Sequence, residues 1–65
     1  MKPLNRYYTS IQLRGGDSLW EIADQYADGS GYSTREYLDE LKRVNGLKGE
    51  EIHSGEYLTV FYYAE

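Results

Sequence analysis

The side chains that could do chemistry in this chain are a few carboxylates and one histidine. Asp17, Glu21, Glu50 and Glu51 could act as general acids or bases, and His53 is the only histidine. There is no cysteine, so the chain has neither a thiolate nucleophile nor a thiolate metal site. The carboxylates stand where helix caps and solvated charges are expected, and none is spaced with a nucleophile or with further metal ligands. We therefore expect no enzyme, no metal site and no cofactor.

A second kind of site could be built from backbone groups. Residues 14–19 read RGGDSL, so two glycines stand directly before an acidic residue and a hydroxyl. Glycine lets a ligand approach the backbone closely, but it is also the default residue for turning a chain. Asp17 and Ser18 are equally suited to cap the helix that follows. On these residues alone, the corner is either a plain turn or one wall of a binding site.

Size and charge restrict the class of partner. The chain has 65 residues and a formal net charge of −4, which argues against nucleic acid and against binding to anionic lipid. No apolar run is long enough to cross a membrane, and the opening MKPLNRYY has no apolar core of a signal peptide. We expect a lead-in over residues 1–6 and a single domain over residues 7–63 that binds a neutral ligand or another protein.

The apolar pattern predicts four elements in the order strand, helix, helix, strand. They are expected near residues 7–13, 17–27, 34–45 and 57–63. Two strands alone are barely stable, so they should pair antiparallel and bury one face under both helices, giving an α+β fold. In the first strand Thr9, Ile11 and Leu13 should lie on one face, with Ser10 and Gln12 on the other. In the last strand the side chains should alternate, with Leu58, Val60 and Tyr62 on one face and Tyr57, Thr59, Phe61 and Tyr63 on the other.

Local signals support both helix boundaries. Each helix start offers a hydroxyl residue followed three positions later by glutamate, which is the pattern of a capping box. The pairs are Ser18 with Glu21 and Ser33 with Glu36. Asn45 and Gly46 form a left-handed stop for the second helix.

Two blocks of sequence resemble the LysM domain, a small module that binds glycans containing N-acetylglucosamine. They are IQLRGGDSLWEIADQY and LKRVNGLKGEEIHSGEYLTV. Together, in this order, they cover most of the chain and match the family's strand-helix-helix-strand layout. The segment DGSGYSTREY is longer than in a typical member, and Ser54 stands where the family often has proline. The long, charged second helix resembles the variant in bacterial cell-division suppressors and wall-associated proteins.

The resemblance implies a non-catalytic site between two loops at one end of the fold. The corner after the first strand and the loop after the second helix should lie side by side. The implied binding residues are Gly16, Asp17, Ser18, Leu19, Gly46, Leu47, Lys48, Ile52 and His53. Backbone groups would pair with the acetamide of the sugar, and apolar side chains would receive its methyl group. The implied partner is peptidoglycan or a chitin-like glycan, with an extracytoplasmic location at the cell wall or surface if the segment belongs to an exported protein.

Each implied residue also has a purely structural explanation. Leu19 and Ile52 could serve only the core, and Lys48 and His53 could simply be solvated. Asn45 is expected to hold the second loop through side-chain bonds to backbone groups. The alternative function is protein–protein interaction or self-association through an outward aromatic face of the last strand, formed by Tyr57, Phe61 and Tyr63.

Overall fold

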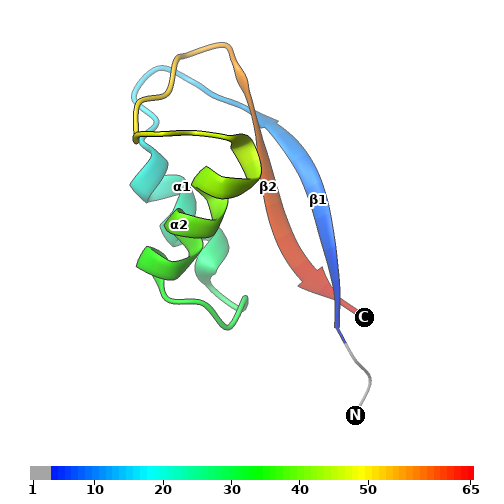
Figure 1. Ribbon diagram of the computed structural model, residues 1–65. Coiled ribbons are helices and arrows are strands. Elements are labelled where there is room, and N and C mark those ends of the chain that lie inside the picture. The colour runs from blue at the N-terminus through cyan, green and yellow to red at the C-terminus, as the bar shows by residue number, and fades with distance from the viewer. Residues whose placement is uncertain (1–3) are drawn as a thin grey trace.

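The computed structural model describes residues 4–65 and contains the four predicted elements in the predicted order. They are β1 (Asn5–Gln12), α1 (Leu19–Ala27), α2 (Thr34–Asn45) and β2 (Tyr57–Ala64). Two helices pack against a two-stranded antiparallel sheet, which confirms the α+β fold (Figure 1). Of the lead-in predicted over residues 1–6, residues 1–3 lie outside the described part of the chain.

The two strands pair over their full length without a bulge. The register runs from Asn5 opposite Ala64 to Gln12 opposite Tyr57. Both helices contact β2, whereas β1 lies on the far side of β2 from them (Figure 1). The layers therefore follow the order helices, β2, β1, and β1 is the outermost element of the fold.

The core lies between the helices and β2. Its members are buried apolar side chains. The helical and strand periods predicted most of them to face the core. The buried members are Leu13, Leu19, Ile22, Ala23, Ala27, Tyr37, Leu38, Leu41, Leu58, Val60 and Phe61. The helices of so small a domain are held mainly by burying these stripes, since propensity alone leaves short helices marginal.

Helix boundaries follow the local signals, with one difference. At α2 the Ser33 hydroxyl accepts from the Glu36 N–H at 3.1 Å and the Ser33 N–H donates to the Glu36 carboxylate at 2.9 Å, a complete capping box. At α1 the Ser18 hydroxyl accepts from the Glu21 N–H at 3.1 Å. Within residues 4–65, no bond runs from the Ser18 N–H back to the Glu21 carboxylate, so this capping box is incomplete. Gly46 ends α2 with a φ of 66°, as predicted.

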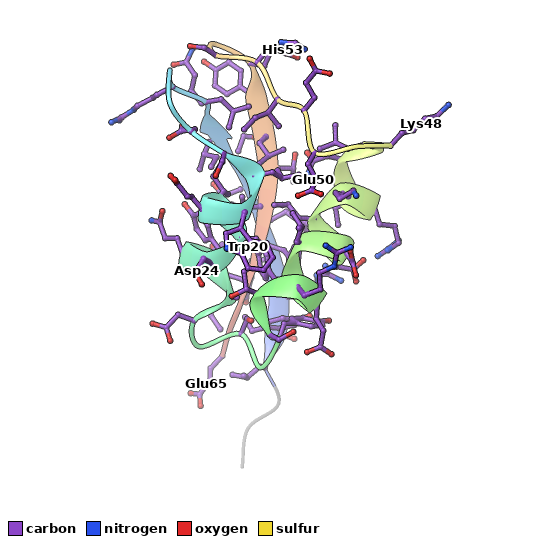
Figure 2. All side chains as sticks on the ribbon, turned by 90° about the vertical axis from the view of Figure 1, so that its left-hand side faces the viewer. Trp20, Asp24, Lys48, Glu50, His53 and Glu65 are labelled. Carbon is purple, nitrogen blue, oxygen red and sulfur yellow. The ribbon has the colours of Figure 1, made fainter. Side chains whose placement is uncertain are left out.

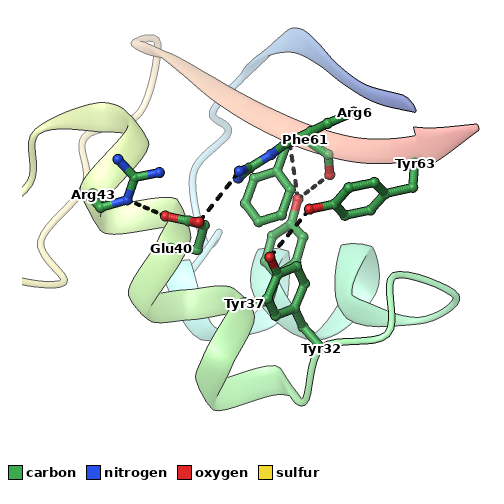
Figure 3. Close-up of polar contacts among 7 residues, drawn as sticks. All are labelled: Arg6, Tyr32, Tyr37, Glu40, Arg43, Phe61 and Tyr63. Atoms are coloured by element: carbon green, nitrogen blue, oxygen red, sulfur yellow. Dashed lines mark hydrogen bonds and ion pairs between the residues drawn. The ribbon is translucent and has the colours of Figure 1, made fainter. Parts of the chain in front are cut away.

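The predicted outward aromatic face of β2 is wrong for two of its three members. Phe61 is completely buried and stacks on Tyr37 of α2, and Tyr63 is half-buried and packs against Tyr32 in the loop between the helices (Figure 3). Only Tyr57 points outward, with 71% of its surface exposed. Strands twist along their length, so the side of β2 that faces the helices changes between Val60 and Phe61. A strict alternation of two cannot describe a strand that turns in this way.

The first strand also differs from its prediction over residues 7–13. It spans Asn5–Gln12, and Thr9, which was predicted to share a face with Ile11 and Leu13, is exposed. Ile11 is half-buried, and Leu13 is buried although it lies just beyond the strand. The helices cover β2 rather than β1. A side chain of β1 can therefore stay exposed on either face of the sheet.

Side chains of α2 close the edge of β2 that faces away from β1. The Asn45 side chain donates to the Thr59 carbonyl at 2.8 Å and accepts from the Thr59 N–H at 2.9 Å. Two helical turns earlier, the Tyr37 hydroxyl donates to the Phe61 carbonyl at 2.6 Å and accepts from the Phe61 N–H at 3.1 Å. The outer backbone groups of Thr59 and Phe61 in β2 are thus satisfied without a third strand.

Candidate functional site

The two loops that sequence reasoning paired lie at the same end of the molecule (Figure 1). Backbone bonds join the segments that carry them. The Leu13 N–H donates to the Glu56 carbonyl at 2.8 Å, and the Gly55 N–H donates to the Leu13 carbonyl at 2.9 Å. The corner after β1 and the loop before β2 are therefore fixed to one another at their base.

The corner is a closed turn with an open outer surface. The Arg14 N–H donates to the Asp17 carboxylate at 2.8 Å, and the Asp17 N–H donates to the Arg14 carbonyl at 3.1 Å. Gly16 has a φ of 91°, a conformation that favours glycine. Gly15 has no such requirement, and an added Cβ at either glycine would meet no atom within 4 Å. The backbone of Gly15 and Gly16 is accordingly open to an approaching molecule.

The second loop starts from a fixed point at the end of α2. The Gly46 N–H donates to the Arg43 carbonyl at 3.3 Å, and the Leu47 N–H donates to the Lys42 carbonyl at 2.8 Å. Leu47 and Ile52 are half-buried and pack against the core, so they anchor a loop that has no regular structure of its own.

A hollow of about 340 Å³ lies beside this loop. It brings together three of the predicted residues, namely Leu47, Ile52 and His53. The other residues that line it are Leu13, Asn45, Glu51, Glu56, Tyr57 and Leu58. Its surface thus combines aliphatic side chains, one amide, two carboxylates, an imidazole and a phenol.

The remaining predicted residues do not line this hollow. The side chain of Leu19 is buried in the core with 1% of its surface exposed, so only its backbone can face a ligand. Ser18 is occupied as the cap of α1, and Asp17 closes the corner turn. Lys48 is exposed and extends away from the body of the molecule, as Figure 2 shows.

Sequence reasoning missed Tyr57 as a residue of this region. Within residues 4–65 it is the most exposed of the large hydrophobic residues, and it lines the hollow, whereas the strand pattern had assigned it to the outward aromatic face. Its position directly after the second loop was the available signal. Trp20, at the start of α1, is 48% exposed and lies on an outer face of the helix pair (Figure 2).

A second hollow lies at the opposite end of the molecule, beside the loop between the helices. It is wider, with a volume of about 760 Å³, and it is lined mainly by residues 24–34. Within it the Thr34 hydroxyl donates to the Asp24 carboxylate at 2.8 Å. No residue of the predicted site contributes to it.

The titratable groups with displaced pKa values lie away from the two loops. The hydrogen bond from Arg43 lowers the pKa of Glu40, and burial raises the pKa of the Tyr37 hydroxyl. The Glu40 carboxylate lies 3.4 Å from the Arg6 guanidinium, which covers the Phe61 ring at 4.0 Å (Figure 3). These shifts follow from packing and ion pairing, so they mark structure rather than a catalytic group.

Among residues 4–65, no three histidine, aspartate or glutamate side chains come close enough together to hold a metal ion. Within the same range, neither helix has the length and apolar character needed to cross a membrane.

Comparison with known proteins identifies the family. The LysM domain model matches residues 12–61. The chain is also 28% identical over 53 residues to the cell division suppressor protein YneA of Listeria innocua, covering 82% of this chain and 49% of the relative. It is 32% identical over 53 residues to the YneA proteins of Bacillus pumilus and Bacillus subtilis, of which it covers 52% and 50%.

These relatives are about twice as long as the aligned segment, so the chain spans about half the length of the curated relatives that it matches. No solved structure matches the chain significantly. The family model covers most of the chain, and the matched range contains both helices, both loops and the first part of β2. The chain belongs to the LysM domain family.

Proposed function

We propose that this domain is a non-catalytic module that binds N-acetylglucosamine-containing glycans, and that its ligand is bacterial peptidoglycan. Family membership together with the placement of the two loops at one end carries this proposal. The relatives from Listeria and Bacillus favour the bacterial wall over chitin as the source of the glycan. On this proposal, the domain would hold a longer protein at the cell wall, outside the cytoplasm.

The exposed corner is suited to the acetamide of the sugar. An acetamide has one N–H and one C=O, and both pair well with backbone groups that have no side chain in the way. Gly15 and Gly16 leave such groups accessible, because nothing lies within 4 Å of where a Cβ would stand. We assign Gly16, Asp17, Ser18 and Leu19 to this wall through their main chain.

The second loop is suited to the apolar parts of the ligand. Leu47 and Ile52 present aliphatic surface to the hollow for the acetamide methyl, and the Tyr57 ring at its edge can stack on a sugar face. His53 also lines the hollow, and we assign Gly46 and Lys48 to this wall through their main chain only, since neither lines the hollow. The acidic protein meets no large electrostatic penalty, since N-acetylglucosamine is neutral.

Binding should be weak for a single module. Because the proposed contacts are mostly to backbone groups, we expect a Kd for short oligomers of about 1 mM, or roughly −4 kcal/mol. Useful attachment to a wall would then depend on several modules acting together.

Co-sedimentation with purified peptidoglycan sacculi tests the proposal. The domain should pellet with the sacculi, and soluble tetra-N-acetylglucosamine should release it. Tyr57→Ala should weaken binding about 2- to 12-fold, since one aromatic stacking contact is worth about 0.5–1.5 kcal/mol. Tyr62→Ala is the matched control, because Tyr62 is exposed on the same strand but does not line the hollow. Failure of the folded domain to pellet would refute the proposal.

A further inference from the structure

The two long edges of the sheet differ in how their backbone groups are satisfied. Thr59 and Phe61 of β2 direct their backbone groups away from β1, where Asn45 and Tyr37 bind them. Antiparallel strands alternate between residues that face the partner and residues that face away. The even-numbered residues of β2 therefore pair with β1, and by the register their partners are the odd-numbered residues of β1.

The outer edge of β1 is consequently formed by its even-numbered residues, Arg6, Tyr8, Ser10 and Gln12. Within residues 4–65, no hydrogen bond reaches the backbone N–H or C=O of any of them from outside the sheet. The helices lie on the other side of β2, so no element shields this edge (Figure 1). An edge strand of eight residues is thus open on one side and largely exposed.

The usual devices that protect an edge are missing from β1. It contains no proline and no lysine, and its register with β2 has no bulge. Its one charged side chain, Arg6, turns away from the edge, because the guanidinium lies over Phe61 and pairs with Glu40 (Figure 3). A strand of high β-propensity therefore presents uncharged, unpaired backbone.

Nearly all of β1 lies outside the part of the chain that matches the LysM model, so this edge belongs to the present chain and not to the family pattern. The family model begins at residue 12, whereas β1 begins at Asn5 and β2 continues to Ala64. The added length carries exposed tyrosines, including the stacked pair Tyr7 and Tyr62, whose ring centroids are 5.7 Å apart. The sheet is therefore extended, beyond what the family model requires, by an aromatic segment.

We infer that this edge binds a second copy of the chain, with β1 pairing antiparallel to β1 of the partner copy about a two-fold axis at Thr9. In this register Tyr8 lies opposite Ser10 of the second copy, and Arg6 lies opposite Gln12. Both pairs consist of outward-facing residues, so they can exchange backbone bonds. Tyr7 lies opposite Ile11, an aromatic and β-branched pair that stabilises sheets.

The second copy is the occupant because the edge is complementary to itself. The strand carries no acidic residue, and the two-fold register places no two like charges opposite each other, although the whole chain has a net charge of −4. The pairing converts a marginal two-stranded sheet into a four-stranded one. It also leaves the loops after β1 at the two far ends of the dimer, so two glycan sites could engage a wall together.

Thr9 provides a sharp test, because it is exposed and would face its own copy across the axis at about 5 Å between Cβ atoms. We expect sedimentation velocity of the wild-type domain, from about 10 µM to about 1 mM, to show a monomer–dimer equilibrium. Thr9→Lys alone and Thr9→Glu alone should be monomeric, and an equimolar mixture of the two should dimerise again. Gln25→Lys and Gln25→Glu carry the same charges on an exposed position of α1 and should dimerise like the wild type.

Amide hydrogen exchange gives a second readout of the same register. In the dimer, the N–H groups of Tyr8, Ser10 and Gln12 should become protected as concentration rises. Those of Tyr7, Thr9 and Ile11, which face β2, should be protected at every concentration. A wild-type monomer over the whole range, a dimer indifferent to both Thr9 variants, or a mixture that stays monomeric would each overturn the inference. Circular dichroism of every variant confirms that the fold is intact.

Discussion

The side-chain amide of Asn45 binds the backbone of Thr59 as a neighbouring strand would, with one bond donated at 2.8 Å and one accepted at 2.9 Å. The same amide also donates to the Leu41 carbonyl at 2.9 Å, so one residue ends the helix and closes the strand edge. Asn45 also lines the hollow beside the second loop. The start of that loop is thereby tied to the sheet through the residue that directly precedes it.

Asn45→Ala tests this connection. The substitution leaves the Thr59 N–H and carbonyl without partners in a half-buried position, and each unsatisfied group costs about 1–3 kcal/mol. We expect the free energy of unfolding to fall by about 2–3 kcal/mol in urea denaturation. Gln25→Ala, at an exposed position of α1, is the control and should change it by less than about 0.5 kcal/mol. Equal stability of the two variants would show that the amide bonds contribute nothing.

Tyr37→Phe separates the hydroxyl of Tyr37 from its ring. The ring stacks on Phe61 with centroids 4.2 Å apart, and phenylalanine preserves that contact. The lost hydroxyl leaves the Phe61 N–H and carbonyl unsatisfied in the core, so thermal unfolding should show a loss of about 2 kcal/mol. A melting temperature equal to that of the wild type would mean that these backbone groups find water instead.

The fold was largely predictable because its signals are local. Ser33 and Glu36 mark the start of α2 within one turn of chain, and Gly46 marks its end; both boundaries were predicted correctly. The direction of Phe61 and Tyr63 could not be read in the same way. It depends on the twist of β2 against two helices that are distant in sequence, and that twist reverses the inward face partway along the strand.

The part of the candidate site that was predicted correctly from the sequence is the part in which the residues follow one another along a single loop. Leu47, Ile52 and His53 were expected on one loop, and they do line one hollow. Tyr57 was missed because the alternation of the strand assigned it to the outward aromatic face, although its position directly after the second loop was an available signal. Leu19 was named for its place in the corner, but its side chain is buried because the start of α1 turns it into the core.

The pH dependence of stability should carry the signature of Glu36. The bond from the Ser33 N–H lowers the pKa of this carboxyl in the folded state. A lowered folded pKa gives stability that is complete above the unfolded value of about 4.3 and is lost as pH falls through the folded value. The free energy of unfolding, measured in urea from pH 7 to pH 2, should therefore decline below about pH 4.3.

Glu36→Gln isolates this contribution, because glutamine keeps an acceptor for the Ser33 N–H but does not titrate. The acidic decline should become shallower in the variant, and Glu40, whose pKa is also lowered, should account for part of what remains. If the free energy of unfolding fell with pH in the same way for the variant and the wild type, the assignment to Glu36 would be contradicted.

The adjacent glycines of the corner should respond differently to alanine. Gly16→Ala should lower stability by about 1–2 kcal/mol, because its φ of 91° strains any residue with a Cβ. Gly15→Ala should leave stability unchanged or raise it by up to about 1 kcal/mol, because its φ is ordinary and the space around it is empty. If a glycan approaches the backbone here, Gly15→Ala should nevertheless weaken binding to sacculi. Full binding by a stable Gly15→Ala domain would mean that the first glycine only turns the chain.

The central claim is that two loops far apart in sequence form one glycan site, and an NMR titration with tetra-N-acetylglucosamine measures this most directly. We predict that backbone amide signals of residues 15–19 and 46–53 move together along one saturable curve, while those of the loop between the helices at residues 28–33 stay fixed. Movement confined to residues 28–33, or movement of only one of the two proposed loops at saturation, would contradict the claim.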